Sequence, residues 1–410
     1  MAIFKPFKAV RPPRDKAHLV SSRSYISYAK RELNSKLSEN PYSFIHIINP
    51  EYNKRKKTPP NSIERFEAVR NKYDEFVSKD YYHRDEKPAF YLYRQLKGNR
   101  SFCGLVGCCA VDDYIAGKIK IHEHTLAPRE EVFKRYLDTT AFHAEPVLMS
   151  HSDDSEIEAV KAKYLSQRPE YDFTTTDTLQ HQMWLIDDPK DIEIISKAFV
   201  NIGELYIADG HHRSASSVGL AVEKRNKGEA YPEGFDYILS YLIPESELEI
   251  LPFHRLVIDT INADLNAVLE KLSVEFDIEE VSDQHKPTSN REVIFIAWDK
   301  TFLLKLKDSV QPEAPLHSIS PDWVSEKILS PVFEIGDLRT DSRIDFLGGK
   351  YDLNAVRSLI KKRAIPYALY LHPVQIDELK AVADACLSMP PKSTFIEPKL
   401  RSGVTIYEMN

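Results

Sequence analysis

The order of apolar and polar positions predicts alternating strands and helices along the chain up to Tyr231. Residues 62–78 carry apolar side chains at helical spacing and predict a helix. Two β-like runs, Ala89–Leu96 and Phe102–Val111, flank Lys97-Gly98-Asn99-Arg100, whose composition predicts a hairpin. Strands that alternate with helices are typical of an α/β fold, so we expect an α/β (mixed α+β) architecture.

The pattern changes beyond Tyr231. Tyr237–Ile243 and Ile250–Ile258 have the character of strands, and Val293–Trp298 with Phe302–Lys307 predicts a second hairpin. We therefore expect an additional α+β domain in the C-terminal part of the chain. The expected division is an N-terminal segment packed on the core over residues 1–84, a central domain over 85–235 and a C-terminal α+β domain over 236–410.

Composition is that of a globular protein with two or three domains: 410 residues, of which 42% are hydrophobic and 29% charged. The net charge of −7 argues against a dedicated nucleic-acid binder, which is usually basic. The four cysteines are too few and too irregularly spaced for a disulfide framework or for paired zinc ligands, and three of them have the character of small core residues. No apolar run suits a signal peptide or a membrane span. These features predict a reduced, cytoplasmic protein without nucleic-acid or membrane partners.

Candidate chemistry is densest in the run Asp209–Ser214, which follows an apolar strand and precedes an expected helix over Ala215–Arg225. Gly210 permits close approach of the backbone to a ligand, and the free N–H groups of a helix start favour phosphate. Arg213 can grip phosphate oxygens in a forked pair, and two adjacent histidines can transfer protons or bind metal. The alternative is a capped helix whose polar residues lie on the surface.

A second constellation is His122-Glu123-His124, at the end of a strand-like run. Glu123 can act as general base on a substrate hydroxyl, with a histidine adjusting its pKa. In an extended segment His122 and His124 share one face while Glu123 points to the other, so a His-x-His metal site is an alternative. Surface polar residues at a strand end are the third interpretation.

A third cluster, Met389–Gly403, contains Lys392, Lys399 and Arg401. These cations are candidates for binding an anionic substrate group, although a structural strand that closes the last domain is the simpler interpretation. The same two interpretations, anion binding or a structural role, apply to Arg339–Arg343, which is followed by Gly348-Gly349. The glycine pair does not have the spacing of a P-loop.

Taken together, these motifs resemble the signature blocks of domain-of-unknown-function family 1015. The resemblance spans nearly the whole chain, and Met-Pro-Pro-Lys-Ser-Thr near the C-terminus is its most specific part. The blocks are Asn40–Phe44, His122–Thr125, Tyr206–Arg213, Arg339–Gly349 and Met389–Gly403. The family name implies no established activity.

The Asp-Gly-His-His-Arg turn is also similar, more distantly, to the phosphate-binding turn of the ParB/sulfiredoxin-like fold, which includes free-serine kinases. That resemblance implies nucleotide-phosphate binding by Asp209–Arg213 and a catalytic role for Glu123, which is followed by Pro128 and Arg129. The sequence departs from the pattern in three ways: a long insertion over residues 142–199, no cysteine in the turn and no evident DNA-binding helices.

The resulting prediction is a nucleotide-dependent phosphotransferase that acts on a small hydroxy amino acid, serine or phosphoserine, with Mg²⁺ and ATP or ADP as cofactors. Two alternatives remain open: a metal-dependent phosphatase or hydrolase, and a non-catalytic nucleotide-binding protein. The predicted catalytic residues are Glu123, His122, Asp209 and His212; the phosphate-binding residues are Gly210, His211, His212, Arg213 and Ser214; the substrate residues are Lys392, Lys399 and Arg401; the metal candidates are His122, His124 and His211.

Overall fold

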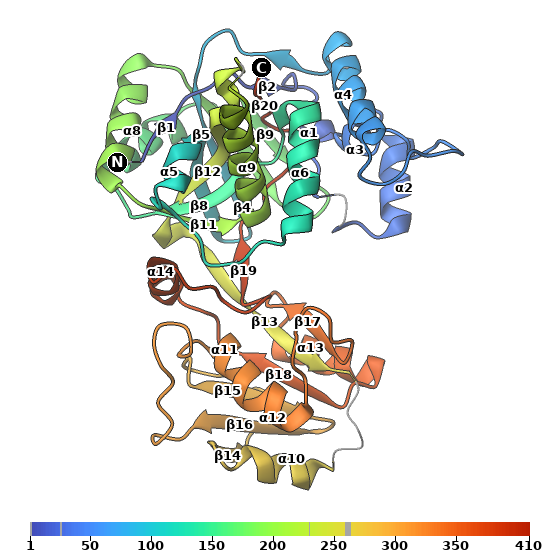
Figure 1. The fold of residues 1–410 in the computed structure, drawn as a ribbon, viewed down its shortest axis with the longest axis vertical. Coiled ribbons are helices and arrows are strands. Elements are labelled where there is room, and N and C mark those ends of the chain that lie inside the picture. Colours follow the sequence, from blue (N-terminus) through green and yellow to red (C-terminus); the bar gives the residue numbers. More distant parts are fainter. Residues whose placement is uncertain (1, 25–26, 229, 259–263) are drawn as a thin grey trace. The chain divides into compact units, whose positions relative to one another are not determined.

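The structure is a computed structural model, and it describes residues 2–24, 27–228, 230–258 and 264–410. The chain divides into two compact units (Figure 1). The first unit contains the residues up to Lys120, Thr125–Leu248 and Pro398–Asn410, and the second contains Ile121–His124 and Glu249–Glu397. The sequence predicted boundaries near residues 84 and 235. In the structure, the segments on both sides of residue 84 belong to the first unit, and the second unit, apart from Ile121–His124, begins at Glu249.

A nine-stranded sheet lies at the centre of the described part of the first unit, in the order β6-β11-β8-β12-β5-β4-β10-β9, with β1 paired to β5. Its strands are β1 (Phe4–Lys5), β4 (Phe90–Lys97), β5 (Arg100–Ala110), β6 (Ile119–Lys120), β8 (Val147–His151), β9 (Tyr171–Thr174), β10 (Gln180–Ile186), β11 (Leu205–Asp209) and β12 (Tyr237–Pro244). The predicted hairpin is confirmed as β4 and β5, which pair from Lys97 and Arg100 outward. Strand β11 runs parallel to β6 but antiparallel to β8.

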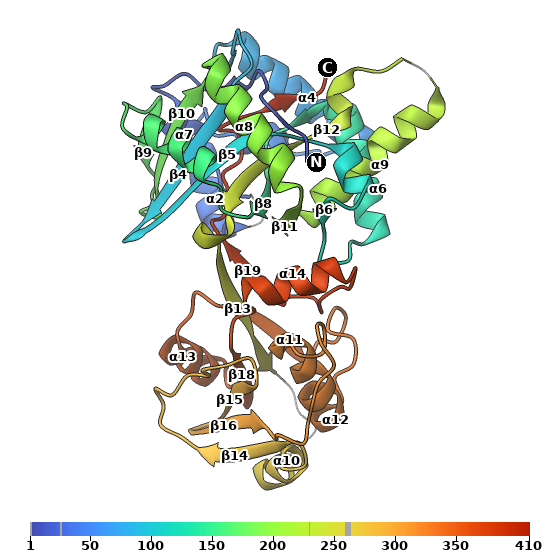
Figure 2. The same ribbon diagram turned by 90° about the vertical axis from the view of Figure 1, so that its left-hand side faces the viewer.

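The longer helices of the first unit are α2 (Lys30–Glu39), α4 (Ile63–Ser78), α6 (Ala127–Thr140), α7 (Ser155–Leu165), α8 (Pro189–Ile202) and α9 (His211–Lys227). Sequence signals set several of their starts: Ser62 caps α4, and Asp188 followed by a proline caps α8. Helices α6 and α9 pack against one another, as do α7 and α8 (Figure 2). The short elements are α1 (Ala17–Val20), α3 (Ile45–Ile48), α5 (Val111–Ile115), β2 (Val10–Arg11), β3 (His83–Arg84), β7 (Phe142–His143) and β20 (Tyr407–Glu408).

Residues 398–410 complete the first unit even though the whole second unit precedes them in the sequence. Strand β20 pairs with β7, and Ile406 forms an isolated bridge with Val10. A side chain at Gly234 would collide with the backbone of Met409, at 2.4 Å from its carbonyl oxygen. The first unit is therefore discontinuous in sequence.

The second unit contains an antiparallel sheet in the order β14-β16-β15-β18-β13-β17, and β19 also pairs with β13. The strands are β13 (Glu249–Val257), β14 (Phe276–Glu280), β15 (Glu292–Ala297), β16 (Lys300–Leu306), β17 (Ile344–Gly348), β18 (Tyr367–Leu371) and β19 (Thr394–Glu397). The helices are α10 (Leu265–Leu272), α11 (Ser320–Val324), a π-helical turn over Ser325–Leu329, α12 (Ser330–Phe333), α13 (Leu353–Arg363) and α14 (Ile376–Asp384). One apolar core surrounds Trp323, and a second packs α13 on the sheet.

The predicted mixed α+β fold class is confirmed by these two sheets and their helices. Cys103, Cys108 and Cys109 are buried in β5, as small core residues should be, and burial raises the pKa of the Cys103 thiol to about 12. Within the described residues, no helix has both the length and the apolar character needed to cross a membrane.

Candidate functional site

The turn from β11 into α9 is the centre of the candidate site in the first unit. Gly210 takes a left-handed backbone conformation with φ of 107°, which L side chains rarely adopt. Helix α9 begins directly after this glycine, at His211. The sequence had predicted a start at Ala215, four residues later. Its first turn contains no acidic residue, and Gly210 provides no side-chain cap. The first N–H groups of a helix have no acceptors within the helix, and helix starts of this kind can bind anions in proteins.

Arg213 holds the turn against the start of β8. Because β11 and β8 are antiparallel, the end of β11 lies beside the residues that precede Val147. The guanidinium donates to the carbonyl oxygens of Glu145 (3.1 Å) and Pro146 (2.5 Å) and forms ion pairs with the carboxylates of Asp209 (2.9 Å) and Glu145 (3.2 Å). Its Nη donors are thus engaged by protein oxygens, which gives Arg213 a role in shaping the turn.

Lys399 reaches the same turn from the C-terminal segment. Its ammonium lies 3.0 Å from Oδ1 of Asp209, while Oδ2 faces Arg213. Desolvation would raise the pKa of Asp209, but the charges of Lys399 and Arg213 outweigh it, so the pKa lies below its ordinary value. Of the three predicted substrate cations, Lys399 is therefore the one in contact with the turn. Arg401 is buried in an ion pair with Asp177 at 2.7 Å.

The two histidines of the turn differ in environment. His211 is buried, and burial lowers the pKa of its imidazole to about 4. His212 is half-buried; desolvation and the charge of Arg129 lower its pKa, and Glu130 opposes that shift. His211 is therefore neutral at pH 7, while His212 is the more accessible of the two for proton transfer.

Glu145 and Ser402 are site residues that the sequence analysis missed. One carboxylate oxygen of Glu145 faces Arg213, and the other accepts a hydrogen bond from Ser402 at 2.9 Å. Neither residue stands out by its local pattern, because each acquires its position only when distant segments meet.

The His122–His124 segment and Lys392 belong to the second unit. His122 is buried and its carbonyl oxygen accepts a hydrogen bond from the N–H of Met389 at 2.9 Å, whereas Glu123 and His124 are exposed. The sequence predicted that both histidines share one face of an extended segment. The strand instead ends at Lys120, and the two rings have different environments.

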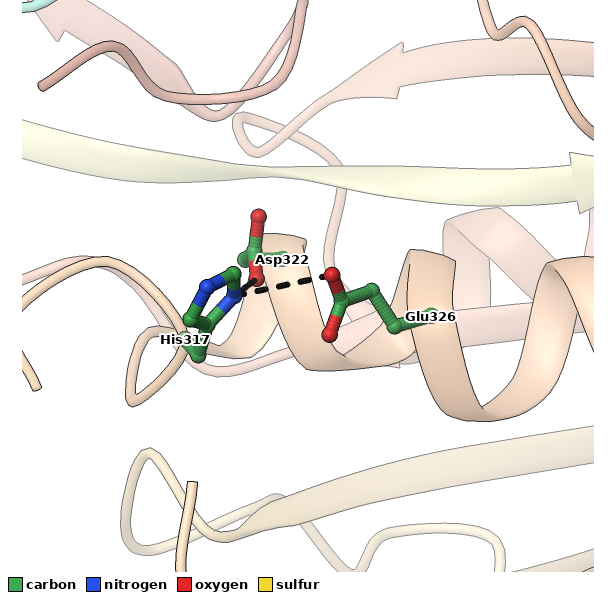
Figure 3. A group of neighbouring side chains, drawn as sticks. All are labelled: His317, Asp322 and Glu326. Carbon is green, nitrogen blue, oxygen red and sulfur yellow. Dashed lines mark hydrogen bonds and ion pairs between the residues drawn. The ribbon is translucent and has the colours of Figure 1, made fainter. Parts of the chain in front are cut away.

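A group with metal-ligand character lies elsewhere in the second unit. His317, Asp322 and Glu326 are the described residues whose ligand atoms come within 4.8 Å of one another (Figure 3). His317 Nδ1 lies 2.8 Å from Asp322 Oδ2 and 3.5 Å from Glu326 Oε1. The hydrogen bond to Asp322 raises the pKa of His317, and burial raises that of Asp322. In this arrangement the imidazole of His317 lies between two carboxylates.

This cluster predicts a pH-dependent contribution to stability. A group whose folded-state pKa is raised stabilises the fold fully below its unfolded pKa, here 6.5 for His317, and loses that contribution as the pH rises through the folded value. Asp322 shifts in the same direction. We expect His317→Gln to reduce the fall in unfolding temperature between about pH 6 and pH 8, measured by calorimetry. An unchanged pH profile in the variant would contradict this assignment.

Comparisons with known proteins identify a family and several solved structures that are similar to the chain. No curated protein matches it. A free serine kinase mutant in complex with ADP is 14% identical, with 73% of this chain and 91% of that chain covered and a TM-score of 0.38. SbnI with C-terminal truncation from Staphylococcus aureus is 14% identical, with 73% of this chain and 85% of that chain covered and a TM-score of 0.38. A conserved hypothetical protein from Pyrococcus furiosus is 14% identical, with 73% of this chain and 93% of that chain covered and a TM-score of 0.36. The model of the family described as "Protein of unknown function (DUF1015)" matches residues 4–327, so the chain belongs to that family, as its motifs indicated.

Proposed function

We propose that the chain is a nucleotide-dependent phosphotransferase that acts on a small hydroxy amino acid, serine or phosphoserine. The start of α9 is the observation that carries this proposal. Gly210 leaves the helix end without a side-chain cap, and the Lys399 ammonium lies beside it at Asp209. A helix N-terminus together with a lysine is a recurrent way to hold phosphate oxygens.

In this proposal the cations of the turn have separate tasks. Lys399 is half-exposed, with 47% of its side chain accessible, and its ammonium can donate to a phosphate oxygen while it stays paired with Asp209. Arg213 is only 23% exposed and keeps the turn in position through Glu145 and Asp209. The backbone N–H groups of His211 and His212 also donate to the phosphate in this proposal, and Ser214 follows them at the start of α9.

The turn is poorly suited to hold Mg²⁺ through protein groups. Mg²⁺ is usually bound by one or two carboxylates together with phosphates and water. Both carboxylate oxygens of Asp209 face cations, Lys399 and Arg213, and Glu145 faces Arg213 and Ser402. Any Mg²⁺ requirement is therefore expected to come from the nucleotide itself.

Glu123 is the proposed general base, on the strength of the sequence resemblance, with His122 as its neighbour. Glu123 is exposed, so its carboxylate is accessible to solvent and to a substrate. Glu123→Gln keeps the size of the side chain and removes the base. We expect this variant to bind nucleotide normally and to lose phosphoryl transfer by about 10²- to 10⁴-fold.

The experiment is ³¹P NMR of the full chain with Mg²⁺, ATP or ADP, and L-serine, repeated with phosphoserine alone. ADP and AMP are suitable binding probes, since free serine kinase has been solved with both. New phosphoserine from wild type but not from Glu123→Gln supports the proposal. Full activity in that variant removes Glu123 as base. Free phosphate from phosphoserine without nucleotide would indicate a hydrolase, and nucleotide binding without any turnover would indicate a binding protein.

A further inference from the structure

Arg255 in strand β13 is a fully buried cation without a carboxylate partner in the described residues. Its exposure is 0%, and its Nη1 donates to the carbonyl oxygens of Phe253 (3.0 Å) and Lys392 (2.8 Å). Its Nε and Nη2 have no hydrogen-bond partner among the described residues. Buried charges in proteins are normally paired, because an isolated buried ion is costly. Arg255 therefore has unused donors at a place where a folded protein seldom leaves them.

The two unused donors form one edge of the guanidinium. Nε–H and Nη2–H point in the same direction and are about as far apart as the two oxygens of a carboxylate or two oxygens of a phosphate. Nη1, on the other side, is the nitrogen engaged by the two backbone carbonyls. The protein thus fixes Arg255 through one edge and leaves the edge suited to bidentate anion binding unpaired.

Lys392 provides a second cation on the same face of β13. Phe253 and Arg255 are two residues apart in the strand, so their side chains share a face. The Lys392 ammonium lies 5.1 Å from the centre of the Phe253 ring, and the Arg255 guanidinium lies 4.8 Å from the centre of the Phe346 ring. Lys392 is exposed and has a left-handed backbone with φ of 60°. The hydrogen bond from Arg255 to the carbonyl oxygen of Lys392 stabilises this unusual conformation.

The glycine pair Gly348-Gly349, at the end of strand β17, also lies beside β13. A side chain at Gly349 would lie 2.5 Å from the carbonyl oxygen of Pro252, and one at Gly348 would meet the Phe395 ring at 2.7 Å. Strand β13 is paired with β17 on one side and with β19 along its first residues. The motifs Arg339–Gly349 and Met389–Gly403 therefore converge on the strand that carries Arg255.

We propose that Arg255 and Lys392 form a binding site for a small oxyanion, a carboxylate or a phosphate group, in the second unit. The anion accepts hydrogen bonds from Nε and Nη2 of Arg255 and pairs with the ammonium of Lys392. Burial lowers the pKa of Arg255 to about 9, so the guanidinium is still charged at pH 7. This site is additional to the α9 turn and does not rest on the proposed phosphotransferase activity.

The test compares the full chain with Arg255→Met, which keeps an apolar stem over Phe346, and with Lys392→Met. Each is titrated with sodium phosphate, sodium acetate and L-serine at constant ionic strength, by calorimetry and by thermal unfolding. We expect anion affinity to fall at least about tenfold in both variants. Without anion, Arg255→Met should unfold at the same or a higher temperature than wild type, because an unpaired buried charge has been removed.

The outcomes separate the anion source and the two sites. A response to phosphate alone assigns a phosphoryl ligand, and a response to acetate and L-serine assigns a carboxylate ligand. Gly210→Ala, which alters the α9 turn, should keep the Arg255-dependent response even if the phosphotransferase proposal fails. If Arg255→Met does not fold, the exposed position Lys392 decides. Wild-type anion binding in Lys392→Met and in any folded Arg255 variant would overturn the proposal.

Discussion

Gly210→Ala is expected to weaken the nucleotide binding that we propose at the start of α9. Alanine at φ of 107° is strained, and its Cβ would lie 3.1 Å from Cζ of Arg213, whose ion pairs shape the turn. Relieving that contact moves the guanidinium and changes the backbone of the first turn of α9, where the proposal places the phosphate. We expect ADP affinity, measured by titration calorimetry, to fall by at least about tenfold, and unfolding free energy to fall by about 1–3 kcal/mol.

Gly228→Ala is the matched control. Gly228 ends the same helix, also in a left-handed conformation with φ of 67°, but an added Cβ there meets no atom within 4 Å. Alanine at this position should cost about 1 kcal/mol through backbone strain alone and leave ADP affinity unchanged. Equal losses of affinity in Gly210→Ala and Gly228→Ala would show that binding follows helix stability and not the geometry of the turn.

Acid is expected to unfold the first unit before the carboxylates are neutralised. His143, His181 and His211 are buried, and burial lowers their pKa values from 6.5 to about 4, 3 and 4 respectively. Because the unfolded state binds protons first, stability is complete above about pH 6.5 and falls as the pH approaches these folded values. Each shift corresponds to an upper limit of about 3–5 kcal/mol, so the three together are comparable with the stability of a domain.

The free energy of unfolding of the full chain, measured with denaturant at several values from about pH 7.5 to about pH 4, gives this loss of stability. His143 is the residue to test, and its Nε2 lies 3.1 Å from the sulfur of Met409. In His143→Gln one titrating group is gone, and stability should fall less steeply with decreasing pH. A slope identical to wild type would mean that His143 is not kept neutral by the fold.

Local patterns predicted the elements that depend on neighbouring residues. The β4–β5 hairpin and helix α4 follow from turn chemistry and from apolar spacing within one segment, and the structure contains both. The start of α9 was predicted four residues late. Histidine and arginine after a glycine have the character of loop residues, yet the left-handed conformation of Gly210 begins the helix at once. The polar composition of this segment did not indicate that Gly210 alone connects β11 to α9.

Contacts between distant segments were beyond sequence reasoning. Lys399 and Asp209 are 190 positions apart, and no periodicity links them. Arg255 is harder still, because an arginine in a strand normally indicates a solvent-facing position, whereas here the side chain is fully buried. Its role depends on the carbonyl of Lys392, 137 positions away, which only the folded chain supplies.

The discontinuity of the first unit has a consequence for synthesis on the ribosome. Domains usually fold in the order in which they emerge. Here residues 398–410 supply β20, the bridge to Val10 and the ammonium at Asp209, and all of them emerge after the second unit. The first unit therefore cannot complete its fold, and β7 cannot pair with β20, until the second unit has been synthesised. A candidate phosphate site that includes Lys399 is completed only at that late stage, so incomplete chains would not carry it.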